Sequence, residues 1–185
     1  MERIGFKEWA AVCRAIADGR QTVIIRKGGI AEGREGFTFK HREFFLFPTW
    51  FHEEAEKITE PEFSAPADLS GDVTINCAVT VEWSGVVSNW EVAKALAPFH
   101  IVREDVVRER FSYKDAPGIH VAFVRAFRLN PAWTFPNEKR FGGCRSWVEL
   151  PEREGDSSFE AVLSESEIAR RRGELSTLLG ALIGR

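Results

Sequence analysis

The sequence predicts an α+β fold: a small mixed, partly closed β-sheet or barrel with an N-terminal helix and a C-terminal helix packed on it. Apolar and polar residues alternate with period two over residues 73–82, which is typical of a strand with one buried face. Apolar residues recur at helical spacing near both ends of the chain. Strand and helix signals alternate irregularly between these ends, which favours α+β over a doubly wound sheet. We expect residues 1–185 to form a single domain, with residues 151–185 as a C-terminal linker and helix.

The first half of the chain predicts an amphipathic helix and two short strands. Phe6, Trp9 and Cys13 recur at helical spacing, and Gly19 can take the left-handed conformation that ends a helix. Pro48 is expected to stop the second strand. By residue number, the expected elements are a helix over 6–18, a strand over 22–25, a loop over 31–43, a strand over 44–47, a short helix over 53–58 and a linker-like stretch over 59–72.

The second half predicts most of the sheet and the C-terminal helix. Ser88 and Glu91 have the spacing of a capping box, which starts a helix, and Ser164 with Glu167 repeats that spacing. The inward-facing residues of the alternating strand are expected to be Val73, Ile75, Cys77, Val79 and Val81. The expected elements are this strand, a helix over 89–97, a turn at 117–118, a central strand over 119–129, an irregular aromatic loop over 131–143, a strand over 146–150 and a helix from residue 164.

The overall charge argues against a protein that coats nucleic acid through bulk electrostatics, because the chain carries a net charge of −3. A local basic cleft is still compatible with that charge. Cys13, Cys77 and Cys144 are far apart and odd in number, and the four histidines lack metal-ligand spacing. We therefore expect no disulfide, no metal and no cofactor. Charged residues stand where a signal peptide needs an apolar run, and no stretch reaches the length of a membrane span, so we expect a cytoplasmic protein without a membrane partner.

Several common sites lack their motifs. Gly28 and Gly33 have the spacing of a phosphate-binding loop, but Arg34 and Glu35 follow where that loop needs Lys and then Ser or Thr. No G-x-G-x-x-G run supports a dinucleotide site. No lysine has an acidic residue two positions before it, as a widespread class of metal-dependent nucleases has. Cys144 follows two glycines, a setting that favours a tight turn over a nucleophile.

An anion-binding site is predicted at the exit of the first short strand. Arg26 and Lys27 supply positive charge there, and Gly28 and Gly29 leave the backbone N–H groups uncovered by side chains. Tryptophan rings could supply a stacking surface for a base. The further residues assigned to this ligand site are Thr49, His52, Arg110 and Ser146 as hydrogen-bonding groups, and Trp147, or else Trp50, as the stacking surface.

Four segments together carry a family resemblance. They are Lys7-Glu8-Trp9 with Arg26 to Ile30, Phe47 to His52, His100-Ile101 with Arg110-Phe111, and Gly143 to Leu150. They resemble the bacterial family called domain of unknown function 1802, with residues 1–150 as the family core. The resemblance brings no catalytic residues with it. It implies one context, because such domains occur in association with a restriction-endonuclease domain, and hence a nucleic acid or a restriction-system protein as partner.

The layout also resembles the PUA-like group of small β-barrels. A helix, then Gly19, then a strand that ends at Arg26, and later a long strand over residues 121–129 follow one another in the order of that group. PUA-like barrels include RNA-binding and modified-base-reading modules. The resemblance therefore implies a barrel-like sheet and an RNA or DNA ligand.

Three functions follow from these patterns, and a binding module for nucleic acid or a nucleotide, in a restriction or defence context, ranks first. The second is an interaction subunit whose C-terminal helix docks on another protein, although its run of three arginines at 170–172 is typical of a solvated helix face. The third is a hydrolase or nuclease with a non-standard site. It would use His52 or His100 as base, with Glu43 or Glu53 nearby, but no spacing supports that geometry.

Overall fold

The computed structural model describes residues 1–27, 37–50, 54–60, 71–113, 117–153 and 155–183, and it describes residues 181–183 by their backbone alone. The strands are β1 (Ile4–Trp9), β2 (Val23–Lys27), β3 (Glu43–Thr49), β4 (Val73–Val87), β5 (Ile119–Phe135), β6 (Trp147–Glu149) and β7 (Ser158–Ala161). The α-helices are α1 (Ala10–Ala17), α2 (Trp90–Ala95), α3 (Glu104–Phe111) and α4 (Glu165–Ile183). Short 3₁₀ helices are η1 (Ala55–Lys57), η2 (Ala97–Phe99) and η3 (Lys139–Phe141).

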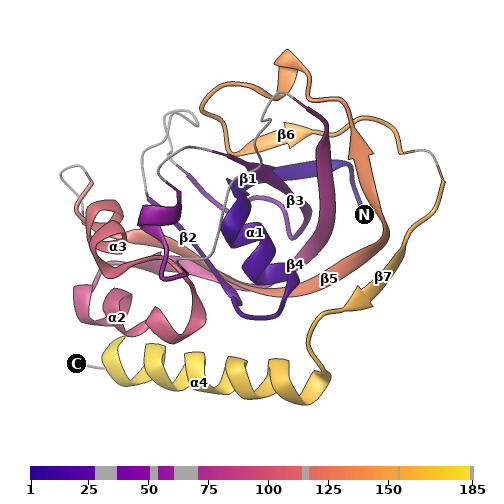
Figure 1. The fold of residues 1–185 in the computed structure, drawn as a ribbon. Helices are drawn as coiled ribbons and strands as arrows, with labels where there is room; N and C mark the ends of the chain where they lie inside the picture. The colour runs from indigo at the N-terminus through magenta and orange to yellow at the C-terminus, as the bar shows by residue number, and fades with distance from the viewer. Residues whose placement is uncertain (28–36, 51–53, 61–70, 114–116, 154, 184–185) are drawn as a thin grey trace.

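The described strands form one mixed sheet that curls around α1 (Figure 1). Their order is β2-β5-β4-β3-β1-β6, and β7 pairs with β5 beside β2. β1 and β3 run parallel, whereas the other pairs are antiparallel. Helix α4 lies along the outside, next to α2. The expected α+β class, with a mixed and partly closed sheet and a helix from each end of the chain packed on it, is confirmed.

The predicted helix over residues 6–18 is wrong in its first part, because Ile4–Trp9 is a strand. Pairing with β3 on one side and β6 on the other outweighs the helical spacing of the apolar residues. Gly5 permits the close approach of β6, since a Cβ there would lie 2.8 Å from Cδ2 of Leu150. Helix α1 begins at Ala10 and ends as expected, with Gly19 in the left-handed conformation at φ 75°.

Strand β4 contains the alternating residues, and all five of them are buried, with at most 8% exposure. The expected single inward face is wrong, however. A register shift lies between Ile75 and Cys77. Beyond it, the alternating side chains point to the opposite face of the sheet. Ile75 therefore packs with Trp133 in one hydrophobic cluster, whereas Cys77 packs in the larger cluster around α1.

Several expected boundaries are displaced. Strand β3 continues through Pro48 to Thr49, because its parallel pairing with β1 extends that far. The side chain of Asn89, not Ser88, caps α2 by accepting hydrogen bonds from the N–H groups of residues 91 and 92 at 2.8 and 3.3 Å. The expected irregular loop over 131–143 is strand up to residue 135. Helix α3 and strand β7 were not predicted, because α3 is rich in charged residues and β7 is short and exposed on every residue.

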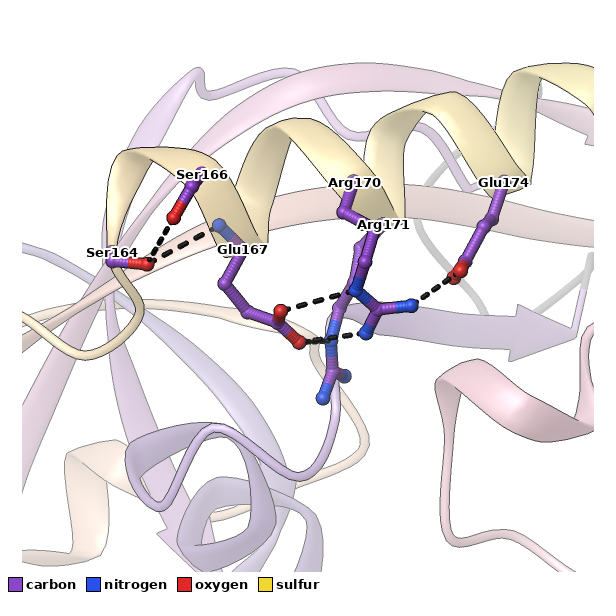
Figure 2. A network of polar contacts seen from close by, with 6 residues as sticks. All are labelled: Ser164, Ser166, Glu167, Arg170, Arg171 and Glu174. Atoms are coloured by element: carbon purple, nitrogen blue, oxygen red, sulfur yellow. Dashed lines mark hydrogen bonds and ion pairs between the residues drawn. The ribbon is translucent and has the colours of Figure 1, made fainter.

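Helix α4 packs through an apolar stripe and presents a salt-bridged face (Figure 2). Ile168, Leu175 and Leu179 are buried. Ser164 caps the helix as expected, since the N–H of Glu167 donates to Oγ of Ser164 at 3.2 Å, whereas the carboxylate of Glu167 binds Arg170 and Arg171. Arg170 and Arg171 both bind Glu167, and Arg170 also binds Glu174. Arg172 binds Glu82 of β4.

Among the described residues, no helix is both long and apolar enough to cross a membrane.

A candidate anion-binding cleft

A cleft of about 310 Å³ lies where the ends of β1 and β2 meet α3 and η1. Four cationic side chains and an indole contribute to its wall. The lining residues are Trp9, Arg26, Lys27, Lys57, Val106, Glu109 and Arg110. Among the described lining residues Glu109 is the only acidic one, so this part of the wall has an excess of positive charge in a chain with a net charge of −3.

Two other clefts are larger, but neither has an excess of positive charge among its lining residues. They have volumes of about 470 and 520 Å³ and share Trp133 and Arg153. In the smaller of the two, Arg3 and Arg153 stand opposite Glu152 and Asp156. In the larger one, Arg153 stands with the same two carboxylates. A volume alone does not select a ligand, and a wall without excess positive charge offers no preference for an anion. The cleft at the ends of β1 and β2 is therefore the stronger candidate for anion binding.

Arg26 joins the two strand ends that form the cleft. Its guanidinium donates to the backbone carbonyl of Lys7 and lies over the ring of Phe6, 4.6 Å from the ring centroid. Its Nε lies 3.8 Å from Oε2 of Glu8, whose side chain is almost completely buried. Arg26 thus compensates a buried carboxylate and also contributes to the cleft wall.

Arg110 reaches the cleft from α3 and is itself buried. Its Nη1 donates to the carbonyl of Ile25 at 2.7 Å, and its guanidinium stacks over the indole of Trp9 at 4.3 Å. Burial lowers the pKa of Arg110 to about 10, with Glu8 opposing that shift and Arg26 adding to it. The group stays protonated at neutral pH, so the cleft contains a cation that has lost part of its hydration.

Two buried carboxylates lie at the start of α1, behind the cleft. Glu8 accepts from the N–H of Trp9 at 2.8 Å, and Glu54 accepts from the N–H of Ala11 at 2.7 Å. They satisfy N–H groups that a helix start leaves without intrahelical partners. Burial raises the pKa of the Cys13 thiol well above its usual value, and both carboxylates add to the shift. Cys13 is therefore a neutral core side chain, as expected.

The structure brings together some of the predicted site residues and separates others. Arg26, Lys27 and Arg110 all line the cleft. Thr49 lies behind it, where its hydroxyl donates to the carbonyl of Glu8 at 3.0 Å. Trp50 is partly buried against the main hydrophobic core. Gly28, Gly29 and His52 lie outside the described residues.

Ser146 and Trp147 do not line this cleft. Ser146 is 2% exposed, and its carbonyl accepts from the N–H of Lys7 at 2.8 Å, next to the β1–β6 pairing. The ring of Trp147 packs against Phe6 and Phe44, with centroid distances of 4.7 and 5.1 Å. The contacts of both residues are therefore those of packing within the sheet.

Of the residues suggested for hydrolysis, His100 and Glu43 lie within the described residues. His100 is buried, and its Nδ1 accepts from the N–H of Val102 at 3.1 Å. Burial and, to a lesser degree, the charge on Arg110 lower the pKa of His100 to about 4. Glu43 is exposed at the start of β3, and Glu53 lies outside the described residues. Cys144 is exposed, and among the described residues no group of three His, Cys, Asp or Glu side chains suits a metal ion.

Sequence reasoning missed Trp9, Lys57 and Glu8 as parts of the site and its support. Trp9 was assigned to a helix stripe, so its place at the end of a strand was not foreseen. Lys57 comes to the cleft through a 3₁₀ turn that pairs with the start of α3, where its carbonyl accepts from the N–H of Arg103 at 3.1 Å. A signal did exist for Glu8, because it stands next to Trp9 in one of the four resemblance segments.

A comparison with solved structures finds ASCH proteins whose chains align with this one over most of their length. The ASCH protein of Zymomonas mobilis aligns with a TM-score of 0.49 and 10% identity, over 97% of this chain and 94% of that chain. A point mutant of that protein aligns with a TM-score of 0.47 and 12% identity, over 95% and 99%. Structural similarity at such low sequence identity does not show that two proteins share a ligand or an activity.

Family membership is clearer. A search of curated proteins with the sequence finds no significant match. The family described as "Domain of unknown function (DUF1802)" matches residues 5–174. The match includes all four resemblance segments and continues past residue 150 into α4. The chain therefore belongs to the DUF1802 family.

Proposed function

We propose that the protein is a binding module whose cleft at the ends of β1 and β2 holds a phosphate group of a nucleotide or nucleic acid. One observation carries this proposal: Arg26 and Lys27 from β2, Lys57 from η1 and Arg110 from α3 converge on a single cleft. Like charges repel one another, and partial burial makes that repulsion more costly. A bound anion would offset this cost.

The arginine, lysine and tryptophan side chains of the cleft would contact the ligand in different ways. Arg26 and Arg110 are held in place by backbone carbonyls and still have further N–H donors for a phosphate oxygen. Lys27, which lies 4.0 Å from the ring centroid of Tyr113, adds a more adaptable charge, as does Lys57. The indole of Trp9 presents an aromatic surface beside these cations, on which a base can stack.

The restriction or defence context implied by the family resemblance belongs to the same proposal. A protein in that context would meet nucleic acid and a restriction-system partner. The alternative of an interaction subunit that docks through α4 is disfavoured, because the apolar stripe of that helix is already buried on the sheet.

Replacing the two cleft lysines tests the proposal without removing the guanidinium next to Glu8. The double variant Lys27→Ala/Lys57→Ala is expected to bind short single-stranded DNA or RNA at least tenfold more weakly. The slope of log K against log salt should fall by roughly 1.4, because each lost phosphate contact accounts for about 0.7 on a single strand. Fluorescence anisotropy at several salt concentrations measures both quantities.

A matched variant controls for loss of charge alone. Lys94→Ala/Lys139→Ala removes two exposed lysines that do not line the cleft, and it should leave affinity and slope within error. Absence of binding by the wild-type protein at low salt would overturn the proposal. Equal weakening by both double variants would also overturn it, because attraction would then come from overall charge.

A further inference from the structure

The positive charge of the cleft continues beyond its wall, across β1. Arg26 is the link, because its guanidinium donates to the carbonyl of Lys7. The Lys7 ammonium then extends away from the cleft residues to a turn, where it donates to the carbonyls of Phe141 at 2.7 Å and Gly143 at 2.8 Å. The N–H of Lys7 also donates to the carbonyl of Ser146. These bonds hold the turn before β6 against β1, with Arg145 within it.

This second group of cations lacks a nearby compensating carboxylate among the described residues. Burial lowers the pKa of Lys7; Cys144 opposes that shift, whereas Arg145 and Arg26 add to it. Arg145 is exposed and forms no ion pair within the described part of the chain. Lys7 and Arg145 therefore add positive charge next to Arg26, whose own carboxylate partner is Glu8.

We infer that the ligand is an extended single strand of nucleic acid, with one phosphate in the cleft and a following phosphate at Lys7 and Arg145. The inference rests on the proposed function and adds the size and form of the ligand. The cleft volume of about 310 Å³ is at the lower end of small-ligand pockets, which suits one unpaired nucleotide. A single indole in its wall offers a stacking surface that a base can use only when it is unpaired.

The anchored turn gives the second subsite its geometry. Lys7 uses two of its three N–H donors on the turn and therefore acts mainly to position it. Arg145 then supplies the mobile, bidentate contact to a phosphate. An isolated mononucleotide occupies the cleft but does not reach this turn.

Length dependence of binding tests the inference. Affinities and salt slopes would be measured for oligothymidylates and oligouridylates of two, four and eight residues, and for an eight-base-pair duplex. The wild-type salt slope should rise by at least about 0.7 between the dinucleotide and the octamer, because a second phosphate is engaged. Arg145→Ala should abolish that rise and weaken octamer binding several-fold, but leave dinucleotide binding unchanged. Arg170→Ala, which removes an exposed arginine from α4, should change neither (Figure 2).

The outcomes separate the two proposals. Equal slopes for the dinucleotide and the octamer, both sensitive to Lys27→Ala/Lys57→Ala, would overturn the extended strand and leave phosphate binding in the cleft intact. Tighter binding of the duplex than of the octamer would also overturn it. No binding of any of these ligands would overturn both proposals.

Discussion

Replacing Arg26 with alanine is expected to lower the free energy of unfolding by about 3 kcal/mol, the cost of leaving a buried charge without its partner. Glu8 is 2% exposed and would keep its carboxylate next to a cavity instead of a guanidinium. The variant also loses the hydrogen bond to the carbonyl of Lys7, which ties β2 to β1. Urea denaturation followed by tryptophan fluorescence measures the loss.

A double-mutant cycle shows whether the buried pair is the cause. Glu8→Gln in the Arg26→Ala background removes the uncompensated charge, so the double variant should be more stable than Arg26→Ala alone. The amide can still accept from the N–H of Trp9, as the carboxylate does. If the two substitutions are simply additive, Arg26 acts through packing on Phe6 and not through its charge.

Acidification between pH 6.5 and about 4 is expected to destabilise the protein through His100. Its pKa falls from 6.5 to about 4 in the folded protein, so the unfolded chain binds a proton in this range and the folded protein does not. Stability is therefore complete above pH 6.5 and is lost as pH falls towards 4. A shift of this size corresponds to about 3 kcal/mol for a buried group.

The variant His100→Asn isolates that contribution, because carboxylates titrate in the same range. Asparagine can still accept from the N–H of Val102 but gains no proton. The difference in stability between wild type and variant should change by about 3 kcal/mol between pH 7 and pH 4. His120→Asn serves as the control, since its histidine is less buried and should give a smaller change. A difference that stays constant with pH would show that His100 does not govern acid sensitivity.

Local sequence patterns predicted correctly those features that depend on the residues of a single helix or strand. Gly19 ends α1, Ser164 starts α4, and the alternating residues of β4 are buried. Errors arose where a distant strand decides the outcome. Residues 4–9 became a strand because β3 and β6 lie on both sides of them, and no feature within that segment shows those partners.

The candidate site follows the same division. Arg26 and Lys27 were identified because they are adjacent and directly follow an apolar run that predicts a strand. Their neighbours in the cleft come from other elements, so the sequence could suggest Arg110 through the family resemblance but could not give its stacking on Trp9. Ser146 and Trp147 belonged to an equally specific segment, yet their contacts lie within the sheet, because a sequence motif does not distinguish packing from binding.

The most direct test of the binding cleft is an NMR titration that follows the indole N–H signals of the six tryptophans. Addition of an eight-residue oligothymidylate or oligouridylate to the wild-type protein should shift the signal of Trp9 most. The signal of Trp133, which lines the two larger clefts, should stay in place. Arginine Nε–H signals of Arg26 and Arg110 should move together with that of Trp9. Shifts centred on Trp133, or none at saturating ligand, would contradict the account.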